Sequence, residues 1–355
     1  MRQPRSGLLR WSVALLVPLA AASCTSPASE PRPSRPSGVE GTIFAIPDTG
    51  SSSPVVAFRL PAETVAPVPA GRSIPTSTYT VSHTSAPDPA GGVDLLVTDE
   101  HQRASVYRVT PTGEATRVGP PLRTGKPDPY FSLSVAGGKA VVASCSRISV
   151  LSFSDPRAWE PVATGCWAGL SPDGSSLVYS PNGAEIDTLR LPDGRPTKLL
   201  DTSRLRGIFP PGFPTPTLVG PPAWGENGLA FTIRSGGEVA IVVRRPSGDV
   251  ATVFREPLIS TSQLPRISWQ PAGNLLAIAD DMGPSGGVLR LWDPESDHLR
   301  AIGLDLLGFS EPQWSPDGSS LASLTSAKSL IVFDPGGAWR LRVETTWEDL
   351  LAWGS

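Results

Sequence analysis

The sequence predicts an all-β fold, and three observations lead to this prediction. From residue 41 onward, no segment keeps the period of 3.6 residues that marks an amphipathic helix. Short runs rich in Val, Leu, Ile and Phe recur between Gly, Pro, Asp and Asn residues, as strands recur between tight turns. The 355 residues are 39% hydrophobic and 18% charged, which is enough apolar material for a large core.

One hairpin pattern recurs seven times: an apolar strand, a turn centred on Pro, and a strand with charged or Thr residues. Neighbouring turn prolines are 36 to 54 residues apart, and they are Pro61, Pro111, Pro156, Pro192, Pro246, Pro294 and Pro335. A period near about 45 residues is that of a four-stranded propeller blade. Residues 41–355 are therefore expected to form one seven-bladed β-propeller, with six or eight blades as the alternatives.

A second turn precedes several of these hairpins and would join strands a and b, counting strands a to d from the axis outward. Its copies are GLSPDGSSLVYS (169–180), AWGENGLAFTI (223–233), SWQPAGNLLAIA (268–279) and QWSPDGSSLASL (313–324). At these residues the chain resembles the TolB-type, WD40-like β-propeller repeat, with its Trp-Ser-Pro-Asp-Gly turn. The resemblance implies a propeller that displays a binding face to another protein.

The two ends of the propeller region complement each other. Only one strand, TIFAI (42–46), precedes the first hairpin, whereas EDLLAWGS (348–355) follows the last one and matches the start of a unit. We expect the C-terminal strand to complete the first blade, which would remove the exposed sheet edges.

The N-terminus predicts export. Three arginines precede an apolar stretch, residues 11–22, that has the length of a signal-peptide core. The following Ala21-Ala22-Ser23-Cys24 resembles a bacterial lipobox, although lipoboxes favour Leu where Ala21 stands. Residues 1–23 are thus expected to be a lipoprotein signal peptide and Cys24 the lipid attachment site, with ordinary signal-peptidase cleavage as the alternative. Residues 24–40 would form a Ser/Pro-rich tether that holds the propeller at the extracytoplasmic face of the membrane.

Two sets of residues have a structural interpretation. Trp224, Trp269, Trp314 and Trp353 share one position of the unit, before the a–b turn, where a large ring would wedge between neighbouring blades. Asp173 and Asp317 lie in Ser-Pro-Asp-Gly turns, where an Asp side chain accepts hydrogen bonds from the nearby backbone. We therefore expect them to stabilise their turns and not to act as catalytic acids.

Cys145 and Cys166 are the cysteines besides Cys24. Cys145 would end a strand b and Cys166 would begin the next strand a, two points on the same face of adjacent blades. A disulfide is possible there in an exported protein, and two buried thiols are the alternative.

Several function classes lose support. Lys and Arg total 30 against 33 Asp and Glu, without charge runs, so we expect no nucleic-acid partner. His83, His101 and His298 have no partner at metal-ligand spacing, and neither a nucleophile elbow nor a P-loop is present. We therefore expect no metal and no cofactor.

The candidate binding residues lie where the chain enters the strands nearest the axis. In this topology the d–a and b–c connections share one face, which we call the loop face; the opposite face, with the a–b and c–d turns, is the turn face. Residues entering the a strands point to the loop face: Tyr130, Phe131, Trp167, Arg266, Glu311 and Asp349.

Two functions are therefore expected. The first is a non-enzymatic, lipid-anchored propeller that binds an envelope protein at its loop face. The alternative is a small-ligand receptor, for a sugar or a lactone-like compound, or a propeller hydrolase, with Glu311 and Asp349 as a carboxylate pair at the axis. The sequence identifies neither the partner nor the oligomeric state.

Overall fold

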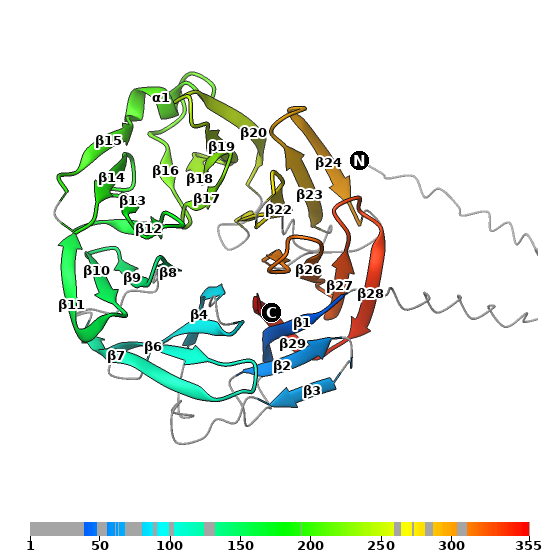
Figure 1. The fold of residues 1–355 in the computed structure, drawn as a ribbon. Helices are drawn as coiled ribbons and strands as arrows, with labels where there is room; N and C mark the ends of the chain where they lie inside the picture. The colour runs from blue at the N-terminus through cyan, green and yellow to red at the C-terminus, as the bar shows by residue number, and fades with distance from the viewer. Residues whose placement is uncertain are drawn as a thin grey trace, which may run out of the picture. The chain divides into compact units, whose positions relative to one another are not determined.

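The computed structural model describes residues 39–47, 55–60, 62, 64–67, 80–87, 91–98, 103–123, 132–192, 194–258, 264–271, 273–280, 287–303 and 311–354. They form seven antiparallel sheets arranged in a ring, each a blade of a β-propeller (Figure 1). The predicted all-β fold and the count of seven blades are confirmed. Cys24 and the signal peptide lie outside the described residues.

The blades are numbered along the chain, and their strands are given from the axis outward. Blade 1 contains β29 (Trp347–Gly354), β1 (Gly41–Pro47), β2 (Val56–Leu60) and β3 (Thr64–Pro67). Blade 2 contains β4 (Thr80–Pro87), β5 (Val93–Thr98), β6 (Arg103–Val109) and β7 (Ala115–Arg123). Blade 3 contains β8 (Ser132–Ala136), β9 (Lys139–Ser144), β10 (Arg147–Ser152) and β11 (Asp155–Ala163). Blade 4 contains β12 (Cys166–Leu170), β13 (Ser176–Ser180), β14 (Ile186–Arg190) and β15 (Thr197–Leu200).

Blade 5 has an inner strand in two pieces. Both β16 (Thr217–Leu218) and β17 (Ala223–Gly225) pair with β18 (Gly228–Ser235), which is followed by β19 (Glu238–Arg244) and β20 (Val250–Pro257). Pro221 and Pro222 lie between the two pieces and have no N–H to donate to a ladder, which explains the interruption. Blade 6 contains β21 (Arg266–Trp269), β22 (Leu276–Asp280), β23 (Val288–Asp293) and β24 (His298–Ile302). Blade 7 contains β25 (Gln313–Trp314), β26 (Leu321–Leu324), β27 (Ser329–Phe333) and β28 (Trp339–Glu344).

The predicted ring closure is confirmed. β29 lies next to β1 (Figure 1) and pairs with it antiparallel. In this pairing Thr42 faces Gly354 and Ile43 faces Trp353. The two ends of the propeller thus share one sheet, and the inner edge of β1 is covered.

The repeated tryptophans join neighbouring blades, as predicted. Trp269 and Trp314 are buried and Trp224 is half-buried. Each indole N–H also donates a hydrogen bond to a backbone carbonyl on the inner strand of the preceding blade, at 3.0 to 3.2 Å: Trp224 to Gly169, Trp269 to Ala223, and Trp314 to Ser268. The ring therefore fills the gap between two blades, and the indole N–H has a hydrogen-bond partner on the preceding blade.

The two Ser-Pro-Asp-Gly turns are built as expected. Asp317 Oδ1 accepts hydrogen bonds from Ser315 Oγ at 2.6 Å and Ser319 N at 3.0 Å, and Gly318 has a φ of +69°. The turn at Asp173 repeats these bonds, and the hydroxyl of its first Ser is the main cause that lowers the pKa of Asp173 to about 2. The carboxylates of Asp173 and Asp317 thus accept hydrogen bonds within their own turns.

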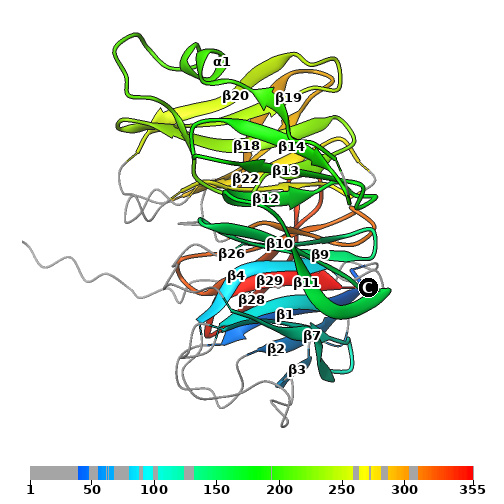
Figure 2. The same cartoon turned by 90° about the vertical axis from the view of Figure 1, so that its left-hand side faces the viewer.

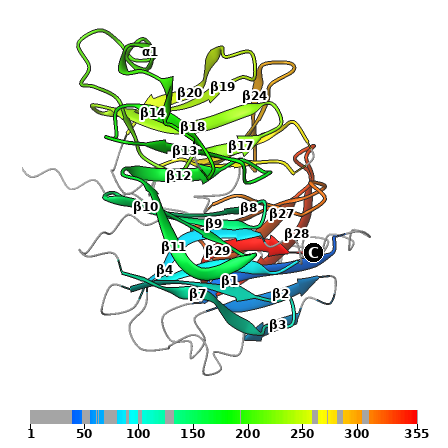
Figure 3. The same ribbon diagram turned by 60° about the vertical axis from the view of Figure 1, so that its left-hand side comes forward.

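The outer strands of blades 2 and 3 also meet. β7 and β11 lie side by side (Figure 3), and Trp159 Nε1 of β11 donates to the carbonyl of Pro120 in β7 at 2.8 Å. Contacts between blades thus extend from the axis to the rim.

Candidate functional site

The candidate site is the loop face. Because each sheet is an antiparallel meander, its d–a and b–c connections leave from the same end of the strands, and the a–b and c–d turns leave from the other. Figure 2 shows the stacked sheets from the side, with the C-terminus at the turn-face end of β29.

Four of the six predicted face residues are described, and each lies at the start of an inner strand. Trp167 is the second residue of β12, Arg266 the first of β21, and Asp349 the third of β29. Glu311 precedes β25 by two residues. They come from blades 4, 6, 1 and 7 respectively, and Arg266 is exposed while Glu311 is partly buried. Tyr130 and Phe131 lie outside the described residues.

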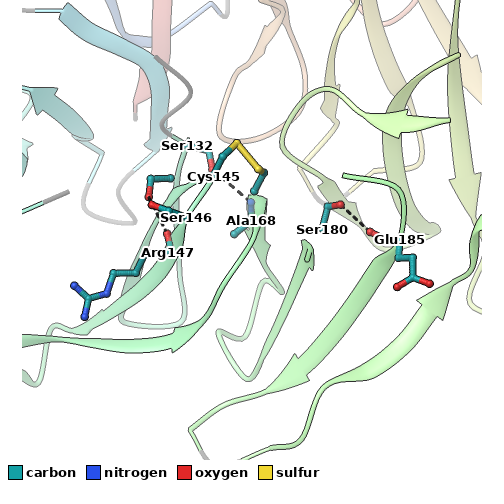
Figure 4. The surroundings of a disulfide bond; sticks show 9 residues. Ser132, Cys145, Ser146, Arg147, Ala168, Ser180 and Glu185 are labelled. Atoms are coloured by element: carbon teal, nitrogen blue, oxygen red, sulfur yellow. Dashed lines mark hydrogen bonds between the residues drawn. A yellow bond between two sulfur atoms is a disulfide. The ribbon is translucent and has the colours of Figure 1, made fainter. Parts of the chain in front are cut away.

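A disulfide joins Cys145 and Cys166 at this face (Figure 4). Cys145 follows the last residue of β9 in blade 3, and Cys166 is the first residue of β12 in blade 4. The bond therefore links two adjacent blades. It lies beside a second link between the same blades, in which Ala168 N donates to Ser132 Oγ (Figure 4).

The backbone next to this disulfide is irregular. Trp167 has a φ of 52°, in the left-handed region that bulky side chains rarely occupy, and the pairing of β12 with β13 shifts register between Cys166 and Gly169. The Trp167 ring is half-buried against the apolar cluster of blades 4 and 5 that includes Ile186 and Leu200. A bulge, a disulfide and a packed ring together hold Trp167 in place, which is the arrangement expected where strained backbone serves a site.

The connection between blades 4 and 5 is a second feature of the site, and it is not among the candidate residues predicted from the sequence. It begins with the short helix α1 (Thr202–Arg206), whose N-cap is Asp201, and continues through a run rich in Pro. The rings of Phe209 and Phe213 stack with centroids 6.3 Å apart. They contribute to a cavity of about 470 Å³ that is also lined by Arg206, Pro210, Pro211, Pro214 and Pro216.

This connection is fixed to both flanking blades. Leu218 N donates to the carbonyl of Gly183 in the b–c loop of blade 4, at 2.8 Å. Ser235 Oγ of blade 5 donates to the carbonyl of Pro214, at 2.6 Å. The density of prolines between residues 210 and 222 was the available signal for an unusually long, ordered connection.

Within the described residues, no three His, Cys, Asp or Glu side chains are grouped so that they could hold a metal ion. His298 lies in β24, His83 is a residue of β4, and His101 lies outside the described part of the chain. No helix among the residues that the structure covers is long and apolar enough to span a membrane.

Comparison with known proteins identifies fold relatives only. No family model and no curated protein sequence matches the chain. Two structures of puromycin hydrolase, one of them a mutant complexed with PGG, match at 17% and 18% identity with TM-scores of 0.55 and 0.56. Both alignments cover 90% of this chain and 54% of the hydrolase. The chain is a seven-bladed β-propeller.

Other propellers match over more of their own length. The β-propeller domain of Cps50 (Swd1) from Myceliophteria thermophila is 13% identical with a TM-score of 0.50, over 78% of this chain and 91% of that domain. TolB from Acinetobacter baumannii is 15% identical with a TM-score of 0.46, over 89% of this chain and 80% of TolB. At such identities a likeness shows the fold alone, and the propeller spans about half the length of puromycin hydrolase.

Proposed function

We propose that this propeller is exported, anchored to the membrane through a lipid on Cys24, and binds another envelope protein at its loop face. The observation that carries the proposal is the loop face itself. Trp167 is held there by the Cys145–Cys166 disulfide and a β-bulge. The connection that leads from blade 4 into blade 5 carries a cavity lined by Phe and Pro side chains. Protein interfaces concentrate their binding energy in rigid aromatic residues of this kind.

Export is supported by two features that are far apart in the sequence. The lipobox-like residues end at Cys24, and the inter-blade disulfide would persist in the oxidising environment outside the cytoplasm. Replacing Cys24 by Ala tests the anchor. The variant should appear in the soluble extracytoplasmic fraction, whereas the parent chain should stay with the membrane and incorporate labelled fatty acid; equal fractionation of the two would refute the anchor.

Cross-linking in intact cells tests the binding face. We expect the tagged parent chain to capture one envelope protein, and the double variant Arg266→Ala/Glu311→Ala to lose it. The matched control is Glu114→Ala/Arg195→Ala, which changes two exposed charges in c–d turns of the turn face and should capture the partner as the parent does. Equal loss in both double variants would place the binding surface elsewhere.

A small-ligand site at the axis is the second candidate, and one observation favours it. Glu311 precedes β25 and Asp349 belongs to β29, and these two inner strands are neighbours. Two carboxylates on adjacent strands could serve hydrolysis or ligand binding, and puromycin hydrolase shares the fold. Turnover or binding of a sugar or lactone that is lost in Glu311→Gln/Asp349→Asn, without any captured protein, would favour this candidate.

A further inference from the structure

Two carboxyl groups meet in the wall between blades 5 and 6. Glu256 belongs to β20, the outermost strand of blade 5, and is half-buried. Asp280 ends β22 of blade 6, and its side chain is almost fully buried. Asp280 raises the pKa of Glu256 both by its charge and by a side-chain hydrogen bond, and two carboxyl groups can share a hydrogen bond only when one of them carries a proton.

One guanidinium, that of Arg290, interacts with both acids: it is hydrogen-bonded to Asp280, and its charge lowers the pKa of Glu256. Arg290 of β23 donates from Nη1 to Asp280 Oδ2, and its guanidinium lies over the Phe254 ring of β20, 4.5 Å from the centroid. With both acids ionised, this wall would hold two negative charges against one positive charge. A single proton between the carboxyl groups balances the charge.

We propose that Glu256 keeps a proton where it faces Asp280, and that its release as the pH rises through neutrality weakens the contact between blades 5 and 6 beneath the loop face. Burial is the first cause that raises the pKa of Glu256, to about 7, and the charge of Asp280 adds to it, while Arg290 opposes both. A carboxyl group in this position changes its charge in a pH range where ordinary carboxylates do not.

The groups around Glu256 leave few other charges to intervene. Asp280 faces it from β22 and Arg290 from β23. Its partner across the β19–β20 ladder is Val239, and its neighbour Arg255 lies 3.6 Å from Glu238 in an ion pair on the other side of the strand. Besides burial, the charges that set the pKa of Glu256 are therefore those of Asp280 and Arg290.

The pair lies next to a predicted binding residue. β20 ends at Pro257, where the chain leaves toward β21, and β22 ends at Asp280, where the b–c connection of blade 6 begins. Arg266 opens β21 and is paired in register with Ala279, the residue before Asp280. If the proton also changed partner binding through Arg266, that effect would rest on the proposed function. The effect of the proton on the contact between blades 5 and 6 does not rest on it.

The sign of the pH dependence follows from linkage. A carboxyl group whose pKa is higher in the folded than in the unfolded state keeps its proton on folding. Its stabilising contribution is complete below about pH 4.5, the value for the unfolded chain, and is lost as the pH rises through the folded value near 7.

Unfolding at several pH values tests the proposal. The urea midpoint of the parent protein should fall between pH 5 and about pH 7.5 and then level off. Glu256→Gln keeps the size of the side chain and a hydrogen-bond donor but cannot become charged. The urea midpoint of this variant should therefore not fall over the same pH range. Glu238→Gln, a carboxylate of the neighbouring strand that pairs with Arg255, is the matched control and should retain the fall.

A titration of the unmodified protein decides the matter even if a variant fails to fold. Carboxyl ¹³C NMR of the full propeller should show one Glu resonance with a midpoint near 7, and backbone amide exchange in β20 and β22 should become faster above that pH after correction for the intrinsic rate. The proposal is overturned if every Glu titrates below about pH 5.5, or if Glu256→Gln unfolds with the same pH dependence as the parent. Neither outcome depends on a binding partner, so the proposed function stands or falls separately.

Discussion

Replacing Trp353 by Ala tests how far the C-terminal strand stabilises the ring. Trp353 is 1% exposed and belongs to a cluster that contains Ile43 of blade 1 and Leu330 of blade 7. Its indole N–H donates to the carbonyl of Glu40 at 3.2 Å. The side chain therefore links β29 both to the N-terminal segment and to the neighbouring blade.

The expected loss can be worked from these contacts. Truncating a fully buried Trp to Ala removes on the order of 200 Å² of buried surface and costs about 3–5 kcal/mol. Loss of the N–H that pairs with Glu40 contributes about 1 kcal/mol of this. Trp353→Ala should thus lower the free energy of unfolding by about 4 kcal/mol, and Trp353→Phe, which keeps most of the apolar ring, by about 1–2 kcal/mol.

Urea unfolding followed by far-UV circular dichroism measures both variants, because tryptophan fluorescence would change with the residue itself. Trp339→Ala is the matched control, since Trp339 lies on the outermost strand of blade 7 and is 42% exposed, and a surface change costs within about 0.5 kcal/mol. If Trp353→Ala were no more destabilising than Trp339→Ala, the closure strand would not hold the ring together, and the argument from the shared sheet would be wrong.

Three further changes have defined outcomes. Cys145→Ser/Cys166→Ser opens a link across 21 residues and should cost about 3 kcal/mol in thermal unfolding, whereas addition of a reductant should then leave the variant unchanged. Asp317→Asn keeps the shape of the turn but removes the charge. Because hydrogen bonds lower the pKa of Asp317, the carboxylate stabilises the folded state above about pH 4 and loses this effect below it. The stability of the variant should therefore fall less steeply in acid than that of the parent. Arg108→Ala leaves the fully buried Asp94 without its two 3.0 Å hydrogen bonds from the guanidinium and should cost about 3 kcal/mol in urea unfolding, most of which Arg108→Leu/Asp94→Leu should recover.

The strands and turns could be predicted because their signals are local. The turn at Asp317 needs only its own Ser, Pro and Gly neighbours, and its bonds span two to five residues. The predicted c–d hairpins likewise correspond to adjacent, paired strands, as at Trp292, which faces Leu299 across β23 and β24. The closure by β29 was a longer-range inference, but it followed from a missing strand at one end and a surplus strand at the other.

The alternation of strands and turns could be predicted from the chain alone, because turn chemistry and period-two patterning act over a few residues. The closure could be predicted as well, because the two ends of the repeat region complement each other. Most of the side-chain contacts between blades, in contrast, emerge only in the folded molecule. The indole of Trp224 reaches Gly169 across 55 residues, and the Cys145–Cys166 bond and the Glu256–Asp280 pair join strands of different blades. Such meetings depend on how each sheet twists and on how deeply neighbouring sheets interleave, and neither quantity is encoded at any single position.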